Sequence, residues 1–240
     1  MRKPRYITAA ELGGVTVRYK WDEWNVKEAY LPAHQELLER LIPLTRRANI
    51  ALTIATAEWI AYRFELLDPD PMPLQYLEAA WAANIDLAYA RYIETDDDQW
   101  RGPVRGPLNV ALMLVIDGLF LEDENPNPAV NAAWITNLAN RVLENTDSFR
   151  MWREAAIDRL DAYYRASATS GEDLFGDEGI KGPLVPREVF DPQFPFTPDL
   201  TAELIRSFLS ELDVRANPFL RTPEAMRELG FKGRPYSFGS

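Results

Sequence analysis

Apolar residues recur at helical spacing over most of residues 29–168, and this pattern constrains the fold more than any other feature of the chain. The first such group is Leu37, Leu38, Leu41 and Ile42. Spacings of one, three and four residues place side chains on one face of a helix. Further helices are predicted over residues 48–67, 74–94, 108–121, 128–144 and 148–168. The pattern predicts a mainly α fold, either an antiparallel helical bundle or a stack of helical hairpins.

A minor N-terminal strand is predicted before these helices. Apolar and polar residues alternate after Gly13-Gly14, with the apolar positions at Val15, Val17, Tyr19 and Trp21. A period of two is typical of a half-buried strand. Its candidate partners are residues 184–190 and 234–238, which are short, so any sheet is expected to be small and peripheral.

Residues 169–199 are rich in Gly, Pro and Asp, yet they also contain large apolar side chains: Leu174, Phe175, Val189, Phe190, Phe194 and Phe196. A long segment without clear elements is uncommon inside a compact domain. We therefore expect this strap to lie extended against the helices. The predicted organisation is an N-terminal strand and lead-in (1–28), a six-helix core (29–168), the strap (169–199), and a C-terminal helix and tail packed on the same domain (200–240).

Composition excludes several kinds of chemistry. The chain has no cysteine, which removes disulfides, thiolate catalysis and Cys-based metal or iron–sulfur sites. Its one histidine, His34, is too few for helical dimetal centres or for zinc sites without cysteine. Glycine-rich phosphate loops and the Gly-x-Ser-x-Gly elbow are both missing from the sequence. The sequence thus predicts no cofactor and no metal, and it favours a non-enzymatic role.

The formal net charge of −11 limits the classes of partner. Affinity for nucleic acid or for an anionic membrane comes mainly from Lys and Arg, so neither partner is expected. An acidic surface instead accelerates the encounter with a basic protein. The longest apolar stretch, residues 110–121, is interrupted by Asp117 and is shorter than the roughly 20 residues that span a bilayer. A soluble, cytoplasmic protein is expected.

An acidic segment between two predicted helices is the candidate interaction surface: Asp96, Asp97, Asp98, Trp100, Arg101 and Arg105. Acids at a helix C-terminus are unfavourable by about 0.3–1 kcal/mol each. Three interpretations remain open. The aspartates are solvated or paired with the two arginines; they contact another protein; or they bind Mg²⁺ with acids that follow, namely Asp117, Glu122 or Asp123.

Asp117 and Glu58 raise a separate question, because each interrupts an apolar helical segment. An unpaired buried charge is unfavourable by several kcal/mol. We expect Asp117 either to face outward near the end of its helix or to pair with an Arg or Tyr side chain. The same structural pairing is expected for Glu58.

The favoured function is that of a non-catalytic, acidic protein-binding module, such as an immunity-type inhibitor or an adaptor. Its partner would be a protein with a basic surface. One alternative is a magnesium-dependent helical enzyme that uses the aspartate-rich loop. A second alternative is a structural subunit of a larger assembly, including a homo-oligomer.

Overall fold

The computed structural model describes residues 2–10, 12, 14, 16–95, 98–120, 127–144, 146–166, 180 and 182–238. These residues form helices and no β-sheet, so the predicted mainly α fold is confirmed. The larger helices are α2 (Gln35–Leu41), α3 (Arg46–Phe64), α4 (Met72–Ile85), α5 (Gly102–Phe120), α6 (Pro128–Val142), α7 (Thr146–Tyr163) and α8 (Thr201–Glu211). The shorter ones are α1 (Arg5–Thr8), α9 (Pro223–Glu228) and the 3-10 helices η1 (Val26–Ala29), η2 (Leu87–Tyr89), η3 (Arg187–Phe190) and η4 (Pro198–Leu200).

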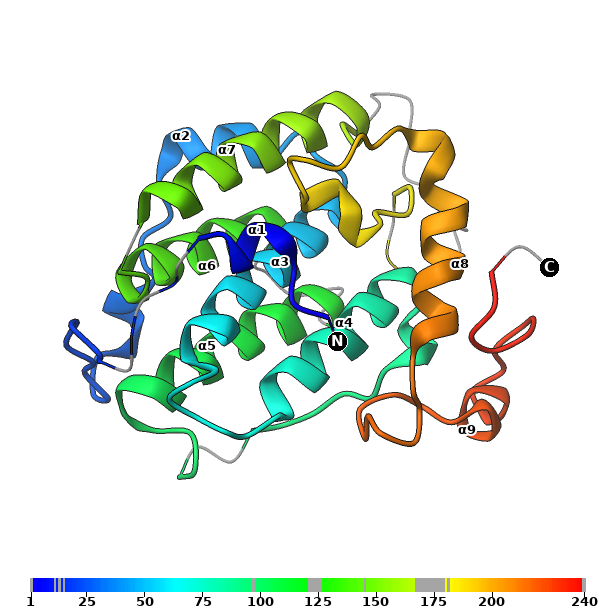
Figure 1. The fold of residues 1–240 in the computed structure, drawn as a ribbon, viewed down its shortest axis with the longest axis horizontal. Coiled ribbons are helices and arrows are strands. Elements are labelled where there is room, and N and C mark those ends of the chain that lie inside the picture. Colours follow the sequence, from blue (N-terminus) through cyan, green and yellow to red (C-terminus); the bar gives the residue numbers. More distant parts are fainter. Residues whose placement is uncertain are drawn as a thin grey trace.

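Helix α3 forms the centre of the bundle because most of its side chains are apolar. The Thr45 hydroxyl caps its N-terminus, and every residue from Arg47 to Phe64 is buried. Helices α4, α5, α6 and α7 all contact it (Figure 1). Trp59 packs against Phe149 and Trp152, with ring centroids 5.4 and 5.3 Å apart. The tryptophans of the central helices therefore fill the core, as burial of aromatic rings favours.

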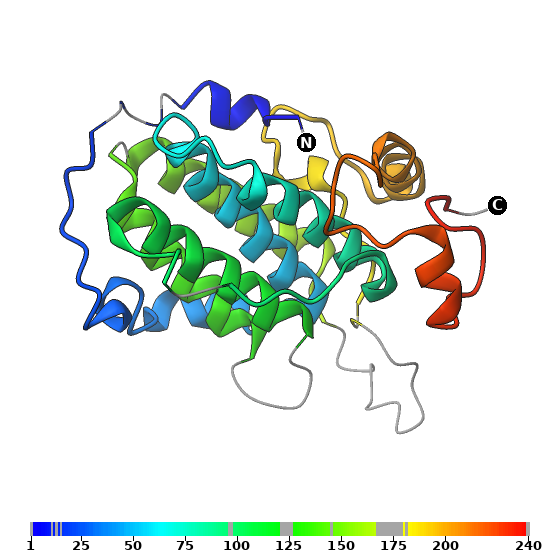
Figure 2. The same cartoon turned by 90° about the horizontal axis from the view of Figure 1, so that it is seen from below.

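The described part of the strap lies against the helices, as the sequence predicts. Val189, Phe190 and Phe196 are buried, and the indole N–H of Trp152 donates to the Phe190 carbonyl at 2.8 Å. Leu174 and Phe175 lie outside the described residues. Helices α8 and α9 follow the strap and lie at one end of the bundle, whereas residues 16–25 run across the opposite end (Figures 1 and 2).

The predicted N-terminal strand is wrong for the residues that can be compared. Residues 16–21 form an irregular lead, and the suggested partner segments hold η3 and a turn instead of strands. Backbone groups of a strand need partners. Here side chains supply them: Arg63 donates to the Thr16 carbonyl at 2.6 Å and Arg141 to the Lys20 carbonyl at 3.1 Å. Val15 lies outside the described residues.

The helix predicted over residues 74–94 ends early, at Ile85. The Asp86 carboxylate accepts the Ala88 N–H at 2.8 Å and starts η2 instead of continuing the α-helix. The chain then runs alongside the segment before α9, where Arg91 N–H donates to the Phe219 carbonyl at 3.0 Å. This pairing with a distant segment replaces the last turns of the predicted helix.

Helix α5 begins at Gly102, earlier than the predicted start at residue 108. Pro107 lies inside this helix and has no N–H to donate to the carbonyl four residues back, that of Pro103. The hydroxyl of Tyr19 donates to that carbonyl in its place. A residue of the N-terminal lead therefore satisfies the acceptor that the proline leaves free, which allows the helix to include the proline.

Among the described helices, α5 is the one long and apolar enough to cross a membrane, judged by length and composition. Of the apolar window in this helix, 61% is buried within the protein. The central helix of a bundle meets the same criteria of length and composition.

Candidate functional site

A groove with a volume of about 290 Å³ lies between the N-terminal lead and the first turns of α5. Its lining residues are Trp21, Glu23, Trp24, Val26, Trp100, Arg101, Gly106, Asn109 and Val110. Three indole rings thus stand beside a carboxylate, a guanidinium and an amide. Apolar walls with a few polar groups are typical of a binding site.

Buried and partly buried contacts hold the lead across the end of the bundle. The side chain of Arg63 on α3 is fully buried, and it donates to the carbonyls of Gly14 and Thr16 at 2.8 and 2.6 Å. It also forms an ion pair with Glu144 at 2.9 Å. The Glu23 carboxylate accepts the backbone N–H of Gly102 at the start of α5. These contacts fix one wall of the groove to the helices.

Trp24 is the most exposed large apolar residue of the described chain, at 99%. It stands on a turn in which the Asp22 carboxylate accepts the Trp24 N–H at 2.9 Å and the Asp22 carbonyl accepts the Asn25 N–H at 3.3 Å. Such an Asx turn fixes the backbone without any contact from the indole. The ring is therefore presented to solvent from an ordered position.

Trp21 packs directly on the backbone of α5 at Gly106. A Cβ atom at position 106 would lie 2.3 Å from the indole Nε1 of Trp21, which is far closer than any real contact. Gly106 has an ordinary helical φ, so its role here is to allow the close approach of an aromatic ring.

Gly106→Ala is expected to displace Trp21 and to lower the free energy of unfolding by about 1–3 kcal/mol. Helix propensity alone would predict a gain of up to about 1 kcal/mol. Gly118→Ala is the matched control, because its Cβ would lie 3.5 Å from Ile50 in ordinary contact. Urea denaturation and the indole N–H resonance of Trp21 measure both effects. Equal stability changes in the two variants would contradict the packing described for Trp21.

The residues singled out from the sequence separate into two groups. Arg101 forms an ion pair with Asp98 at 2.7 Å, and both side chains are exposed. Arg105 turns away to Asp68 and Asp70, at 2.7 and 3.2 Å.

The guanidinium of Arg105 lies 5.4 Å from the ring centroid of Trp100, which is buried and lines the groove. Asp96 and Asp97 lie outside the described residues. One arginine therefore folds back on the aspartate-rich loop, and the other holds a groove tryptophan in place.

A shared magnesium site for Asp98 and Asp117 is incompatible with the length of α5. Asp98 precedes the first turn of this helix and Asp117 lies in its last turn. At 1.5 Å per residue, Gly102 and Asp117 are about 22 Å apart along the axis. Glu122 and Asp123 lie outside the described residues. Within the part of the chain that the structure describes, no group of three His, Asp or Glu side chains is placed to hold a metal ion.

Asp117 is half-buried near the C-terminal end of α5. Burial raises its pKa, and its charge contributes, after burial, to the raised pKa of Tyr30. The phenol of Tyr30 is thus the neighbour on which this carboxylate acts.

Asp117→Asn is expected to raise the melting temperature at pH 7 by about 1–2 °C, a small effect because water screens a half-exposed group. A carboxyl whose pKa is raised on folding favours the folded state at low pH and loses that contribution as the pH rises. The gain should therefore vanish below about pH 4. Melting curves at pH 4 and pH 7 test this, and a gain that is larger at pH 4 would show that the sign is wrong.

A second cluster of polar groups lies inside the bundle, around Glu58. This fully buried carboxylate accepts the indole N–H of Trp81 at 2.8 Å and pairs with Arg187 of the strap at 2.9 Å. Burial raises the pKa of Glu58, although Arg187 and Trp81 oppose the shift. Burial alone would lower the pKa of Arg187, but Glu58 and Tyr6 raise it overall. The expected structural pairing of Glu58 is present.

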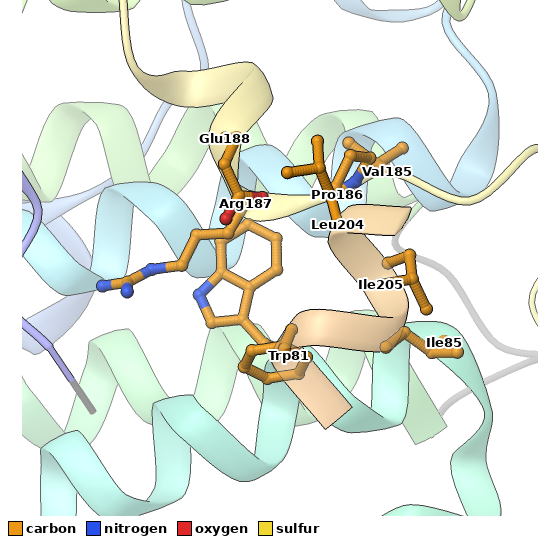
Figure 3. A pocket seen from close by; sticks show the side chains of 9 residues that line it. Trp81, Ile85, Val185, Pro186, Arg187, Glu188, Leu204 and Ile205 are labelled. Atoms are coloured by element: carbon orange, nitrogen blue, oxygen red, sulfur yellow. The ribbon is translucent and has the colours of Figure 1, made fainter. Parts of the chain in front are cut away.

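The pocket beside this cluster is too small for a substrate. Figure 3 shows Trp81, Arg187 and Glu188 at its edge and apolar residues of α8 opposite, with the Arg187 side chain extending away past the indole. The pocket volume is about 10 Å³. That is room for about one water molecule. We therefore regard the groove beside Trp24 as the candidate site.

Comparison with known proteins gives no relative: the chain matches no family model, no curated protein and no solved structure. The candidate site consequently rests on geometry and chemistry alone. His34 adds nothing to it, because this histidine is exposed at the start of α2.

Of the residues that line the groove, Trp100 and Arg101 belong to the surface predicted from the sequence, whereas Trp21, Glu23 and Trp24 do not. Trp24 could have been predicted from the local sequence. It follows Asp22 by two residues, and Asp at that position favours an Asx turn, which would expose the indole. No local signal joins Trp21 to Gly106, which are 85 positions apart (106 − 21).

Proposed function

We propose that the chain is a non-catalytic binding module that docks a partner protein with a basic surface. The docking face is the Trp24 turn together with the groove beside it. An immunity-type inhibitor or an adaptor acts in this way, by occupying a surface of its partner.

The exposed indole of Trp24 carries this proposal. The turn already fixes the backbone at Trp24, and an indole has only two side-chain torsions, so little conformational entropy is lost when a partner covers this 99% exposed ring. Tryptophan is also among the residues most enriched at the energetic centre of interfaces. The formal charge of −11 favours encounter with a basic face.

Photo-crosslinking in the native host tests the docking face. A photoreactive phenylalanine derivative at position 24 is expected to capture one basic partner, and the same group at position 151 is not. Met151 is the matched control because it is 74% exposed on α7.

The captured partner, once purified, gives the quantitative test. Trp24→Ala is expected to weaken its binding by about 30-fold or more. Met151→Ala should leave the Kd within about twofold, as is usual for residues outside an interface. Higher salt should slow association. Equal affinities of the two variants for the partner would overturn the proposal.

A further inference from the structure

Glu23 has acceptor capacity that the described part of the chain does not use. One of its oxygens accepts the backbone N–H of Gly102, and the side chain is exposed at the edge of the groove. An ionised carboxylate offers about four acceptor positions on its two oxygens. The second oxygen is thus available to a donor that enters between Glu23 and the neighbouring indoles.

The groove walls favour a cation over other occupants. An apolar side chain would cover the Glu23 carboxylate without supplying a hydrogen bond, which is unfavourable. An anion would be repelled by Glu23, while Arg101 already pairs with Asp98 at 2.7 Å. A cation instead gains attraction from both the carboxylate and the face of an indole ring.

The same chain already builds such an arrangement for one of its own arginines. The guanidinium of Arg105 lies 5.4 Å from the ring centroid of Trp100. Its Nε and Nη2 atoms contact the carboxylates of Asp68 and Asp70 at 2.7 and 3.2 Å. A guanidinium is planar, so it stacks on a ring while its N–H groups reach carboxylates. A compact ammonium cannot do both equally well.

We propose that the groove takes one arginine side chain of the partner, with its guanidinium against the indole of Trp24 and its N–H groups donating to Glu23. This inference rests on the proposed function, since it names the part of the basic partner that enters the site. This arginine contact adds to the contact that the partner makes by covering Trp24.

A short arginine peptide tests this without the partner. Acetyl-Gly-Arg-Gly-amide is titrated into the ¹⁵N-labelled full chain while the indole N–H resonances of Trp21 and Trp24 are followed. Saturable binding in the millimolar range is expected. The citrulline peptide has the same shape without the charge and should bind about tenfold more weakly, and the lysine peptide about threefold more weakly.

Two variants locate the site. Glu23→Gln and Trp24→Ala should each weaken the binding of the arginine peptide by about three- to tenfold. Met151→Ala should not change its binding. Equal binding of the arginine and citrulline peptides, binding that is unaffected by Glu23→Gln, or no saturable shift of either indole would overturn the inference.

The two proposals fail in different ways. If a partner crosslinks at position 24 but the arginine peptide does not bind, the proposed arginine contact is wrong and the proposed docking face stands. If the arginine peptide binds but no partner crosslinks at position 24, the cation site stands and the proposed function is wrong.

Discussion

Arg187→Met is expected to lower the free energy of unfolding by about 3–5 kcal/mol. The Arg187 side chain is largely buried, its Nη2 lies 2.9 Å from Glu58, and its Nη1 donates to the Arg2 carbonyl at 2.9 Å. Methionine fills similar space but leaves the fully buried Glu58 carboxylate with the Trp81 indole as its remaining donor among the described residues. A buried charge that loses its partner is strongly unfavourable. Urea denaturation measures the loss.

Two further variants separate the charge from the packing. Glu58→Gln combined with Arg187→Met removes both charges, so the double variant should be more stable than Arg187→Met alone. Arg165→Met is the surface control: its pair with Asp161 is 60% exposed on the arginine side, and a change below about 1 kcal/mol is expected. A double variant no more stable than Arg187→Met would show that packing, and not the unpaired carboxylate, causes the loss.

Arg63→Met is expected to lower the free energy of unfolding by about 3 kcal/mol and to loosen the groove. The guanidinium is fully buried, and its loss leaves the carbonyls of Gly14 and Thr16 and the carboxylate of Glu144 without this donor. The lead that carries Trp21 and Trp24 then loses its anchor on α3. The indole N–H resonances of both tryptophans should shift or broaden in the variant.

Arg18→Met is the matched control for this anchor. Arg18 approaches the same Glu144 carboxylate, but at 4.0 Å and with a side chain that is 78% exposed. Its replacement should change stability by less than about 0.5 kcal/mol. If the Arg63 variant were as stable as the Arg18 variant, the lead would not depend on this contact.

Helices with a continuous apolar face could be predicted from the sequence, because the periodicity that forms them is local. The helix from Pro128 and the one that carries Trp152 are examples. The errors occur where distant segments decide the outcome. The end of α4 depends on residues near Phe219, and the start of α5 depends on the Tyr19 hydroxyl that serves the Pro103 carbonyl. The predicted strand fails because its backbone groups bond to side chains such as Arg63.

The candidate site was less predictable than the fold. Its chemistry comes from two segments, residues 21–26 and residues 100–110, that meet only in three dimensions. The acidic loop predicted from the sequence contains Trp100 and Arg101, which line the groove in the second segment. Of the first segment only Trp21 belongs to the predicted strand, and Glu23, Trp24 and Val26 lie beyond that pattern.

Hydrogen–deuterium exchange of the chain with and without its captured basic partner tests the docking face most directly. Protection is expected over residues 21–26 and 100–110, the two segments that form the groove. It should be small over α8 and α9, which lie at the opposite end of the bundle (Figure 1). Protection confined to α8, α9 or the strap, with the Trp24 turn unchanged, would contradict the proposed docking face.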